Sequence, residues 1–150
     1  MSARIIPWIL AASLLGLAIS SYSFLHNRGF TSGSFCTINE TVNCDVVNKG
    51  AYSTVVGIPV ALVGVLGYGF LVLASILKVR APHDRQLTRV LLIASVLGLA
   101  FSLYLTSLEA FVLHAWCLLC VSSQIMIILI VILTSYLTYH ESYDHRISQS

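Results

Sequence analysis

Four long apolar stretches dominate this chain and leave it few ways to fold. Only 9% of its residues are charged and 57% are hydrophobic, whereas about a quarter of a soluble domain is charged. A bilayer core of about 30 Å requires roughly 20 helical residues. The stretches that meet this length cover about residues 5–25, 58–79, 90–113 and 117–137. We therefore predict an all-α membrane protein, folded as a bundle of four transmembrane helices.

The remaining sequence indicates a single domain over residues 1–150, without repeats or low-complexity segments. The first apolar stretch is longer than the roughly 7–15 residues of a signal-peptide core and no small-residue cleavage site follows it, so we expect it to be retained as a helix. The long polar loop, residues 26–57, joins the first two spans. We expect a short surface helix in the second part of this loop, residues 45–56, and a fraying polar tail from Thr138 onward.

The charges of the loops predict the orientation of the spans. Four basic residues and one acid lie in the connection between the second and third spans, which includes the end of the second span: Lys78, Arg80, Arg85, Arg89 and Asp84. Loops rich in Lys and Arg stay in the cytoplasm, which predicts that both termini are inside and that loop 26–57 is outside. The net charge is +2, and the basic residues are scattered along the chain without forming a patch. We therefore expect no nucleic-acid partner. The expected surroundings of the spans are membrane lipid.

Four cysteines form two pairs that this orientation places on the same, extracytoplasmic side. Cys36 and Cys44 lie in the polar loop, where an oxidising compartment allows them to form a disulfide. Cys117 and Cys120 form a C-L-L-C motif at the predicted start of the last span. Their spacing puts both sulfurs on one face of a helix, and the helix N-terminus favours a thiolate at Cys117 over one at Cys120.

Three interpretations of these cysteines stay open on the residues alone. They can be structural, as small apolar side chains in a helix and as a disulfide that braces the loop. They can form a four-cysteine zinc site, although the spacing of Cys36 and Cys44 is wider than in common zinc knuckles. They can also relay electrons by thiol–disulfide exchange, and only this interpretation uses both pairs on one membrane face. We expect no bound metal.

The combined motifs resemble the vitamin K epoxide reductase family, in its short single-domain prokaryotic-type form without a fused thioredoxin-like domain. The resemblance covers about residues 5–138. It is carried by C-T-I-N-E-T-V-N-C in the outer loop, by D-V-V-N, Y-S and G-I-P-V-A-L-V-G after it, by S-L-Y-L-T-S-L-E-A-F-V-L-H-A-W-C, and by W-C-L-L-C at the start of the last span.

The resemblance implies a catalytic role for all four cysteines. Cys36 would take electrons from a partner dithiol through a mixed disulfide, and Cys44 would pass them on by attacking a disulfide at Cys117. Cys120 would then reduce a quinone of the ubiquinone, menaquinone or vitamin K type. The protein would thus be a membrane thiol–quinone oxidoreductase that supports disulfide-bond formation. Because the chain ends at Ser150, we expect a separate thioredoxin-like or DsbA-like partner.

Other functions remain as alternatives. The family's other activity is reduction of a quinone epoxide, such as vitamin K epoxide. DsbB-like proteins are also four-helix thiol–quinone enzymes, but their C-x-x-C motif lies in the first outer loop, which disfavours them here. The non-enzymatic alternative is a structural or four-cysteine metal-binding membrane protein.

Two positions depart from the family pattern and suggest quinone-binding residues. The serine that many members carry six residues after the second loop cysteine is Gly50 here, so its hydrogen-bonding role is either absent from this chain or has moved to Ser53. The tyrosine four residues after the last cysteine of animal members is Gln124. Gln124 lies one helical turn from Cys120 and is a candidate donor to a quinone carbonyl. Hydrogen bonding between helices is the alternative role.

Glu109 and His114 are candidates for proton handling. Glu109 is a carboxylate within an apolar run, where ionisable groups usually have a function; contact with water at the outer interface is its alternative. His114 precedes Cys117 by three residues. Its charge could lower the pKa of that thiol or it could pass on a proton. A solvated interfacial histidine without a chemical role is the alternative.

Overall fold

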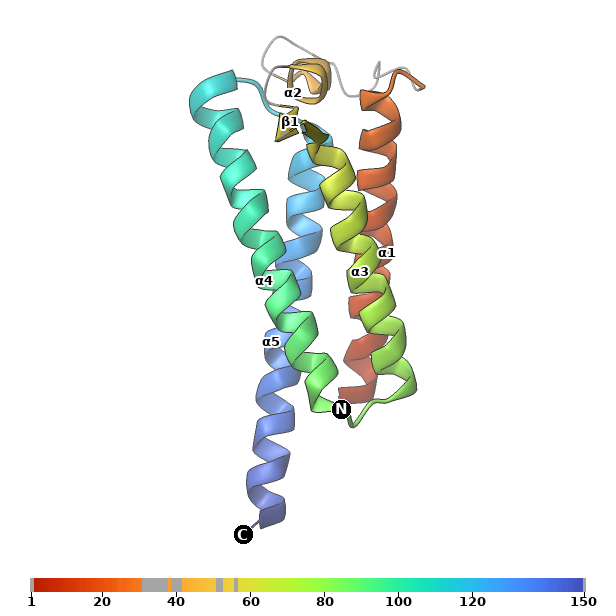
Figure 1. Cartoon of the computed structure of the whole chain (residues 1–150). Helices are drawn as coiled ribbons and strands as arrows, with labels where there is room; N and C mark the ends of the chain where they lie inside the picture. The colour runs from red at the N-terminus through yellow and green to blue at the C-terminus, as the bar shows by residue number, and fades with distance from the viewer. Residues whose placement is uncertain (1, 31–37, 39–41, 51–52, 56, 150) are drawn as a thin grey trace.

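Four long helices stand side by side in the computed structural model, which describes residues 2–30, 38, 42–50, 53–55 and 57–149 (Figure 1). Their bounds are α1 (Ser2–Asn27), α3 (Val60–Arg80), α4 (Arg85–Leu108) and α5 (Leu118–Gln149). All four are long and apolar enough to cross a membrane, so the predicted four-helix membrane fold is confirmed. Large apolar side chains such as Leu66, Ile93 and Ile132 are exposed on the outside of the bundle, as contact with lipid requires.

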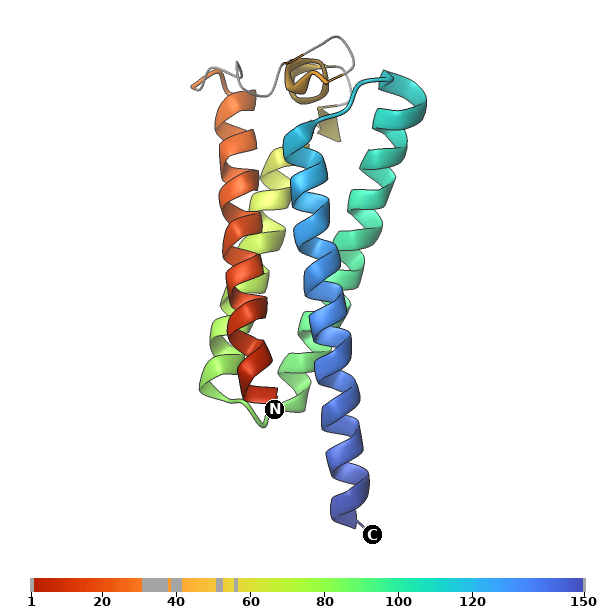
Figure 2. The same ribbon diagram turned by 180° about the vertical axis from the view of Figure 1, so that it is seen from behind.

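The helices form a ring in which α1 and α4 each pack against both α3 and α5. Consequently α3 and α5 face each other across the interior, and α1 begins at the same end at which α5 finishes (Figure 2). The packed core belongs to the half of the bundle near these ends. Its buried side chains are Ile6, Ile9, Ala12, Tyr68, Leu71, Ala74, Leu91, Ile127, Ile130 and Leu137.

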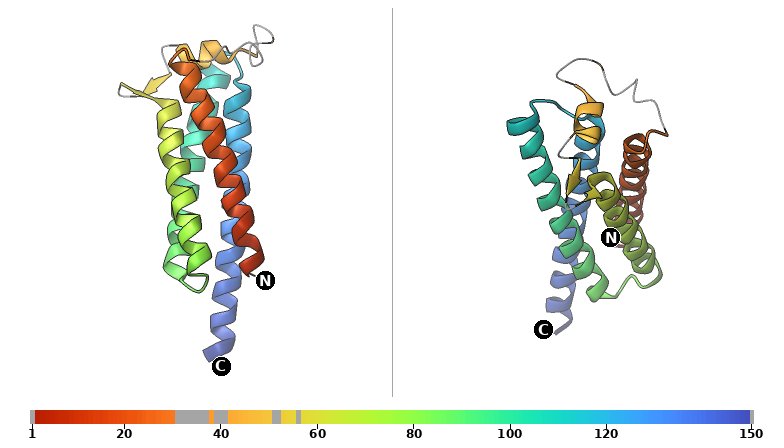
Figure 3. Two further views of the ribbon diagram at one scale, coloured as in Figure 1. Left: turned by 90° about the vertical axis from the view of Figure 1, so that its right-hand side faces the viewer. Right: turned by 45° about the horizontal axis from the view of Figure 1, so that its top comes forward.

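Short elements cover the opposite end of the bundle (Figure 3). The helix α2 (Cys44–Lys49) lies across the helix ends, which confirms the short helix predicted between the first two spans. A small antiparallel hairpin of β1 (Thr54–Val55) and β2 (Ile58–Pro59) leads into α3. Gly57 in its turn has φ +80°, a left-handed conformation that favours glycine.

The last two spans depart from the predicted bounds. α4 begins at Arg85 rather than near residue 90, because the Asp84 side chain accepts a hydrogen bond from the Gln86 N–H at 2.8 Å and caps the helix. α4 then continues into η1 (Glu109–Leu113), a π-helical turn. α5 remains helical to Gln149, so the expectation of a fraying tail from Thr138 is wrong.

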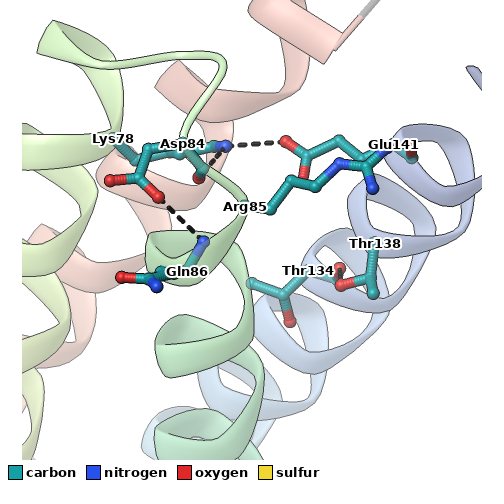
Figure 4. A network of polar contacts seen from close by, with 7 residues as sticks. All are labelled: Lys78, Asp84, Arg85, Gln86, Thr134, Thr138 and Glu141. Atoms are coloured by element: carbon teal, nitrogen blue, oxygen red, sulfur yellow. Dashed lines mark hydrogen bonds and ion pairs between the residues drawn. The ribbon is translucent and has the colours of Figure 1, made fainter. Parts of the chain in front are cut away.

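A buried ionic network holds the long α5 at the end away from α2 (Figure 4). The Lys78 side chain is fully buried, and its Nζ lies 2.6 Å from Glu141 Oε1 and 2.8 Å from the Asp84 carbonyl oxygen. Arg85 donates a hydrogen bond to the Glu141 carbonyl. These contacts join α3, the α3–α4 turn and α5, and they explain why α5 stays ordered beyond its apolar part.

Candidate functional site: two sulfurs in contact beneath α2

Cys44 and Cys117 bring their sulfur atoms together beneath α2. Cys44 opens α2 and Cys117 immediately precedes α5, and both side chains are completely buried. The two Sγ atoms are 3.5 Å apart, which is van der Waals contact, whereas bonded sulfurs are about 2.05 Å apart. Cys44 takes part in a disulfide bond, and Cys117 and Cys120 are present as thiols. A thiol therefore touches a disulfide sulfur, as the start of thiol–disulfide exchange requires.

Backbone pairing holds Cys44 at this place. Val42 forms a parallel bridge with Trp116, and the Asn43 N–H donates a hydrogen bond to the Trp116 carbonyl at 3.2 Å. The Asn43 side chain accepts a hydrogen bond from the Asp45 N–H at 3.0 Å, as expected of a residue that caps a helix start. The residues before each sulfur are thus paired with one another, which fixes α2 over the start of α5.

Cys117 and Cys120 form the inner pair of cysteines. Of these two, Cys117 is the one whose surroundings favour the thiolate. The Val121 N–H donates to the Cys117 carbonyl at 3.0 Å, so the first turn of α5 starts at this residue. A hydrogen bond from the Cys120 thiol lowers the pKa of the Cys117 thiol below its ordinary value, and hydrogen bonds from the backbone N–H groups of Cys120 and Leu119 act in the same direction. Burial and the charge of Glu109 raise this pKa, but their effect is smaller. A lowered pKa favours the thiolate form of Cys117 at lower pH, both when this sulfur attacks a disulfide and when it is the leaving group.

Glu109 lies against the inner pair. Its side chain is buried, with 3% exposed, and Oε2 accepts a hydrogen bond from the Cys117 N–H at 3.2 Å. The Cys120 thiol also lies within hydrogen-bonding reach of this carboxylate. η1 begins at Glu109, and π-helical turns are frequent at functional sites. The carboxylate is thus in contact with both members of the inner pair.

Cys120 borders a cavity of about 330 Å³ inside the bundle. All four long helices contribute to its wall, which is mostly apolar and includes Leu97, Phe101 and Leu119. Ligand pockets in proteins span about 300–1,000 Å³ and are mainly apolar with a few polar groups. A cavity of this size and character suits a flat, apolar ring system next to the Cys120 sulfur.

Gln124, Ser53 and His114, the other predicted site residues that the structure describes, are not among the residues that line this cavity. Gln124 Oε1 accepts a hydrogen bond from the Thr106 hydroxyl at 2.6 Å, which is the interhelical alternative considered for it. Ser53 borders a smaller cavity of about 40 Å³ together with Glu109 and Cys120. His114 is exposed and has φ 50°. Cys36 lies outside the described residues.

Two polar contacts near the site were missed by the sequence analysis. On α1, His26 is completely buried and its Nε2 lies 3.5 Å from Asp45 Oδ1, one residue after Cys44. On α3, Tyr68 makes a hydrogen bond to Ser123 of α5. Each pair joins residues far apart in the chain, so no local pattern indicates it. Among the described residues, no three His, Cys, Asp or Glu side chains are placed to hold a metal ion.

The fold and the site define a class of protein: a four-helix membrane protein with a pair of thiols between a disulfide-bearing capping helix and an apolar cavity. The chain belongs to the vitamin K epoxide reductase family, whose model matches residues 7–135. No match was found among curated proteins. Family membership indicates an oxidoreductase of the membrane, of a family that uses quinones as electron partners and generally works with thioredoxin-like proteins.

Proposed function

We propose that this protein is a membrane thiol–quinone oxidoreductase that oxidises a dithiol of a separate thioredoxin-like or DsbA-like protein and reduces a quinone. The observation that carries the proposal is the 3.5 Å contact between Cys44 Sγ and Cys117 Sγ. It connects the loop pair with the inner pair, and the inner pair borders the apolar cavity. Electrons can therefore pass from an outer dithiol to a quinone without any large movement of the helices.

The reaction balances in three exchanges. We assign Cys36 as the other half of the Cys44 disulfide. The partner dithiol reduces this disulfide through a mixed disulfide with Cys36 and becomes a disulfide itself. The Cys44 thiolate attacks Cys117 of an oxidised inner pair, which forms a Cys44–Cys117 disulfide and releases Cys120 as a thiol. Cys36 then attacks Cys44, which restores the Cys36–Cys44 disulfide and releases Cys117 as a thiol. These thiols then give two electrons and two protons to the quinone, which becomes a hydroquinone, while Cys117 and Cys120 form a disulfide. In the structure, Cys44 is oxidised and Cys117 is reduced, which corresponds to the state after the exchange between the loop pair and the inner pair. The contact between the two sulfurs serves either direction, because thiol–disulfide exchange is reversible.

The distribution of charge supports an orientation with α2 on the extracytoplasmic side. The end of the bundle away from α2 carries most of the basic residues: Arg4, Lys78, Arg80, Arg85, Arg89 and Arg146. The α2 end carries Arg28 and Lys49. Because Lys and Arg near the ends of spans stay in the cytoplasm, both cysteine pairs would face the oxidising compartment in which disulfides form.

A substitution at Cys120 separates the two halves of the reaction. In Cys120→Ala, we expect a small dithiol still to reduce the Cys44 disulfide, while reduction of a water-soluble quinone is abolished. The matched control is Leu118→Ala, which changes an exposed residue of the same motif and should retain quinone reduction. Normal quinone turnover by Cys120→Ala would refute the assignment. Replacing the quinone with its epoxide in the same assay tests the other activity of the family.

A further inference from the structure

The cavity beside Cys120 contains a polar pair that no family motif of this sequence includes. The Tyr68 hydroxyl donates a hydrogen bond to the Ser123 carbonyl at 2.6 Å, and the Ser123 hydroxyl donates one to Tyr68 Oη at 3.1 Å. Both residues border the cavity. Since α3 and α5 face each other across the ring, the Tyr68 side chain crosses the interior of the bundle to reach its partner.

The position of Tyr68 is built into the packing of α1. A Cβ atom at Gly16 would overlap the Tyr68 ring, so the glycine lets this ring lie directly against the α1 backbone. The Tyr68 side chain is buried, with 6% exposed, and it belongs to the packed core. The Tyr68 ring thus packs against α1 and its hydroxyl is hydrogen-bonded to α5, so the phenol oxygen has one fixed position in the cavity wall.

The Tyr68 hydroxyl contacts the residue of α5 that lies one helical turn after Cys120. Ser123 follows Cys120 by three residues in α5, so the two side chains are neighbours on one face of the helix. Residues at this spacing have Cβ atoms roughly 5–6 Å apart. A ring that occupies the cavity beside Cys120 therefore has Ser123 and Tyr68 along its edge.

We infer that Tyr68 donates a hydrogen bond to a carbonyl oxygen of the quinone that Cys120 reduces, and that Ser123 supports this donor. This inference rests on the proposed function. When the quinone is bound, the Tyr68 hydroxyl turns from the Ser123 carbonyl to the quinone oxygen. The carbonyl is left with the bond of its own helix. The Ser123 hydroxyl keeps donating to Tyr68, and such a chain of hydrogen bonds strengthens its last donor.

The chemistry of the step explains why a donor is needed at this place. Two electrons leave the Cys117 and Cys120 sulfurs as the disulfide forms, and the quinone oxygen gains negative charge before protons arrive. The two thiol protons complete the hydroquinone, so Tyr68 itself loses no proton overall. A preorganised donor at the oxygen that gains charge stabilises the transition state more than the bound substrate.

The test uses the purified full chain with 2-methyl-1,4-naphthoquinone as acceptor and dithiothreitol as donor. In Tyr68→Phe, we expect kcat for quinone reduction to fall about tenfold to a hundredfold, as for loss of a hydrogen bond to a charged oxygen. The rate at which dithiothreitol reduces the Cys44 disulfide should not change, and a role in packing alone would not produce this difference. The matched control is Tyr104→Phe, which removes the hydroxyl of an exposed tyrosine of α4 and should keep the wild-type kcat.

Two further variants test the geometry. Ser123→Ala should lower kcat less than Tyr68→Phe, because the donor remains and only its support is lost. Gly16→Ala should lower kcat while the tyrosine hydroxyl is retained, since the ring is displaced. Its control is Gly69→Ala, where an added Cβ meets nothing within 4 Å. If the wild type reduces the quinone and the kcat of Tyr68→Phe lies within twofold of the wild-type kcat, the role of Tyr68 is refuted and the proposed function stands. If the wild type reduces no quinone, the proposed function itself fails.

Discussion

The buried ion pair between Lys78 and Glu141 gives a sharp prediction for stability. The Lys78 side chain is fully buried and that of Glu141 is 13% exposed, with 2.6 Å between Nζ and Oε1. In Glu141→Ala, the ammonium keeps the neutral Asp84 carbonyl at 2.8 Å and loses its counter-charge. Removal of one partner from a buried pair destabilises by about 3–5 kcal/mol, so we expect a loss of this size in the free energy of unfolding.

Three further variants separate the effect of the Lys78 and Glu141 charges from the effect of removing side-chain atoms. Glu141→Gln keeps a hydrogen-bond acceptor and should lose less stability than Glu141→Ala. The double variant Lys78→Met with Glu141→Leu removes both charges and should lie close to wild type, because replacement of a buried pair by apolar residues is often neutral. Asp144→Ala changes an exposed acid of the same helix and should stay within about 0.5 kcal/mol of wild type.

Equilibrium unfolding in mixed micelles, followed by circular dichroism, measures these differences. The circular dichroism of the folded state also shows whether the last turns of α5 lose helix when the network is broken. A change of less than about 1 kcal/mol in the free energy of unfolding of Glu141→Ala would contradict this prediction, since a buried ammonium without a counter-charge must be costly. A double variant less stable than Glu141→Ala would contradict it as well.

Two other predictions concern the site. The reaction of Cys117 with a small methanethiosulfonate should rise with pH through a midpoint below the value of about 8.5 for an ordinary cysteine, because the hydrogen bond from Cys120 lowers its pKa. In Cys120→Ala this midpoint should move to higher pH, and an unchanged midpoint would show that the hydrogen bond is not the cause. His26→Ala removes the contact between α1 and Asp45, so exchange between Cys44 and Cys117 should slow by up to about tenfold, as measured by stopped-flow quenching and mass spectrometry. Quinone reduction by an inner pair reduced beforehand should be unaffected; if exchange keeps its wild-type rate, His26 does not hold α2 in place.

The membrane fold was predictable because hydropathy alone specifies it. Apolar runs of more than about 20 residues with few charges leave helices across a bilayer as the main solution. The ends of the helices were less predictable. The cap at Asp84 is a local signal that could have extended α4 to Arg85, whereas the helical tail of α5 depends on Lys78, which is 63 residues away from Glu141 in the chain.

The same distinction applies to the site. The C-L-L-C motif predicted that Cys117 and Cys120 would share one helix start, because spacing within a helix is local information. The positions of Tyr68 and His26 depend on packing between helices, and one glycine on α1 decides where the tyrosine ring lies. A single sequence contains no periodicity that relates residues 16, 68 and 123. Predictions of the quinone contact therefore turned to Gln124, the nearest polar residue in the chain.

The contact between Cys44 and Cys117 is tested most directly by trapping it. In a protein with Cys36→Ser and Cys120→Ser, each of the two sulfurs lacks the partner that we assign to it, and the two sulfurs lie 3.5 Å apart. We predict that mild oxidation in the membrane converts most of this variant to a Cys44–Cys117 disulfide, identified by mass spectrometry of the linked peptides. If the two thiols instead stay reduced, or if impermeant reagents label them from opposite sides of the membrane, the electron relay described for this protein is wrong.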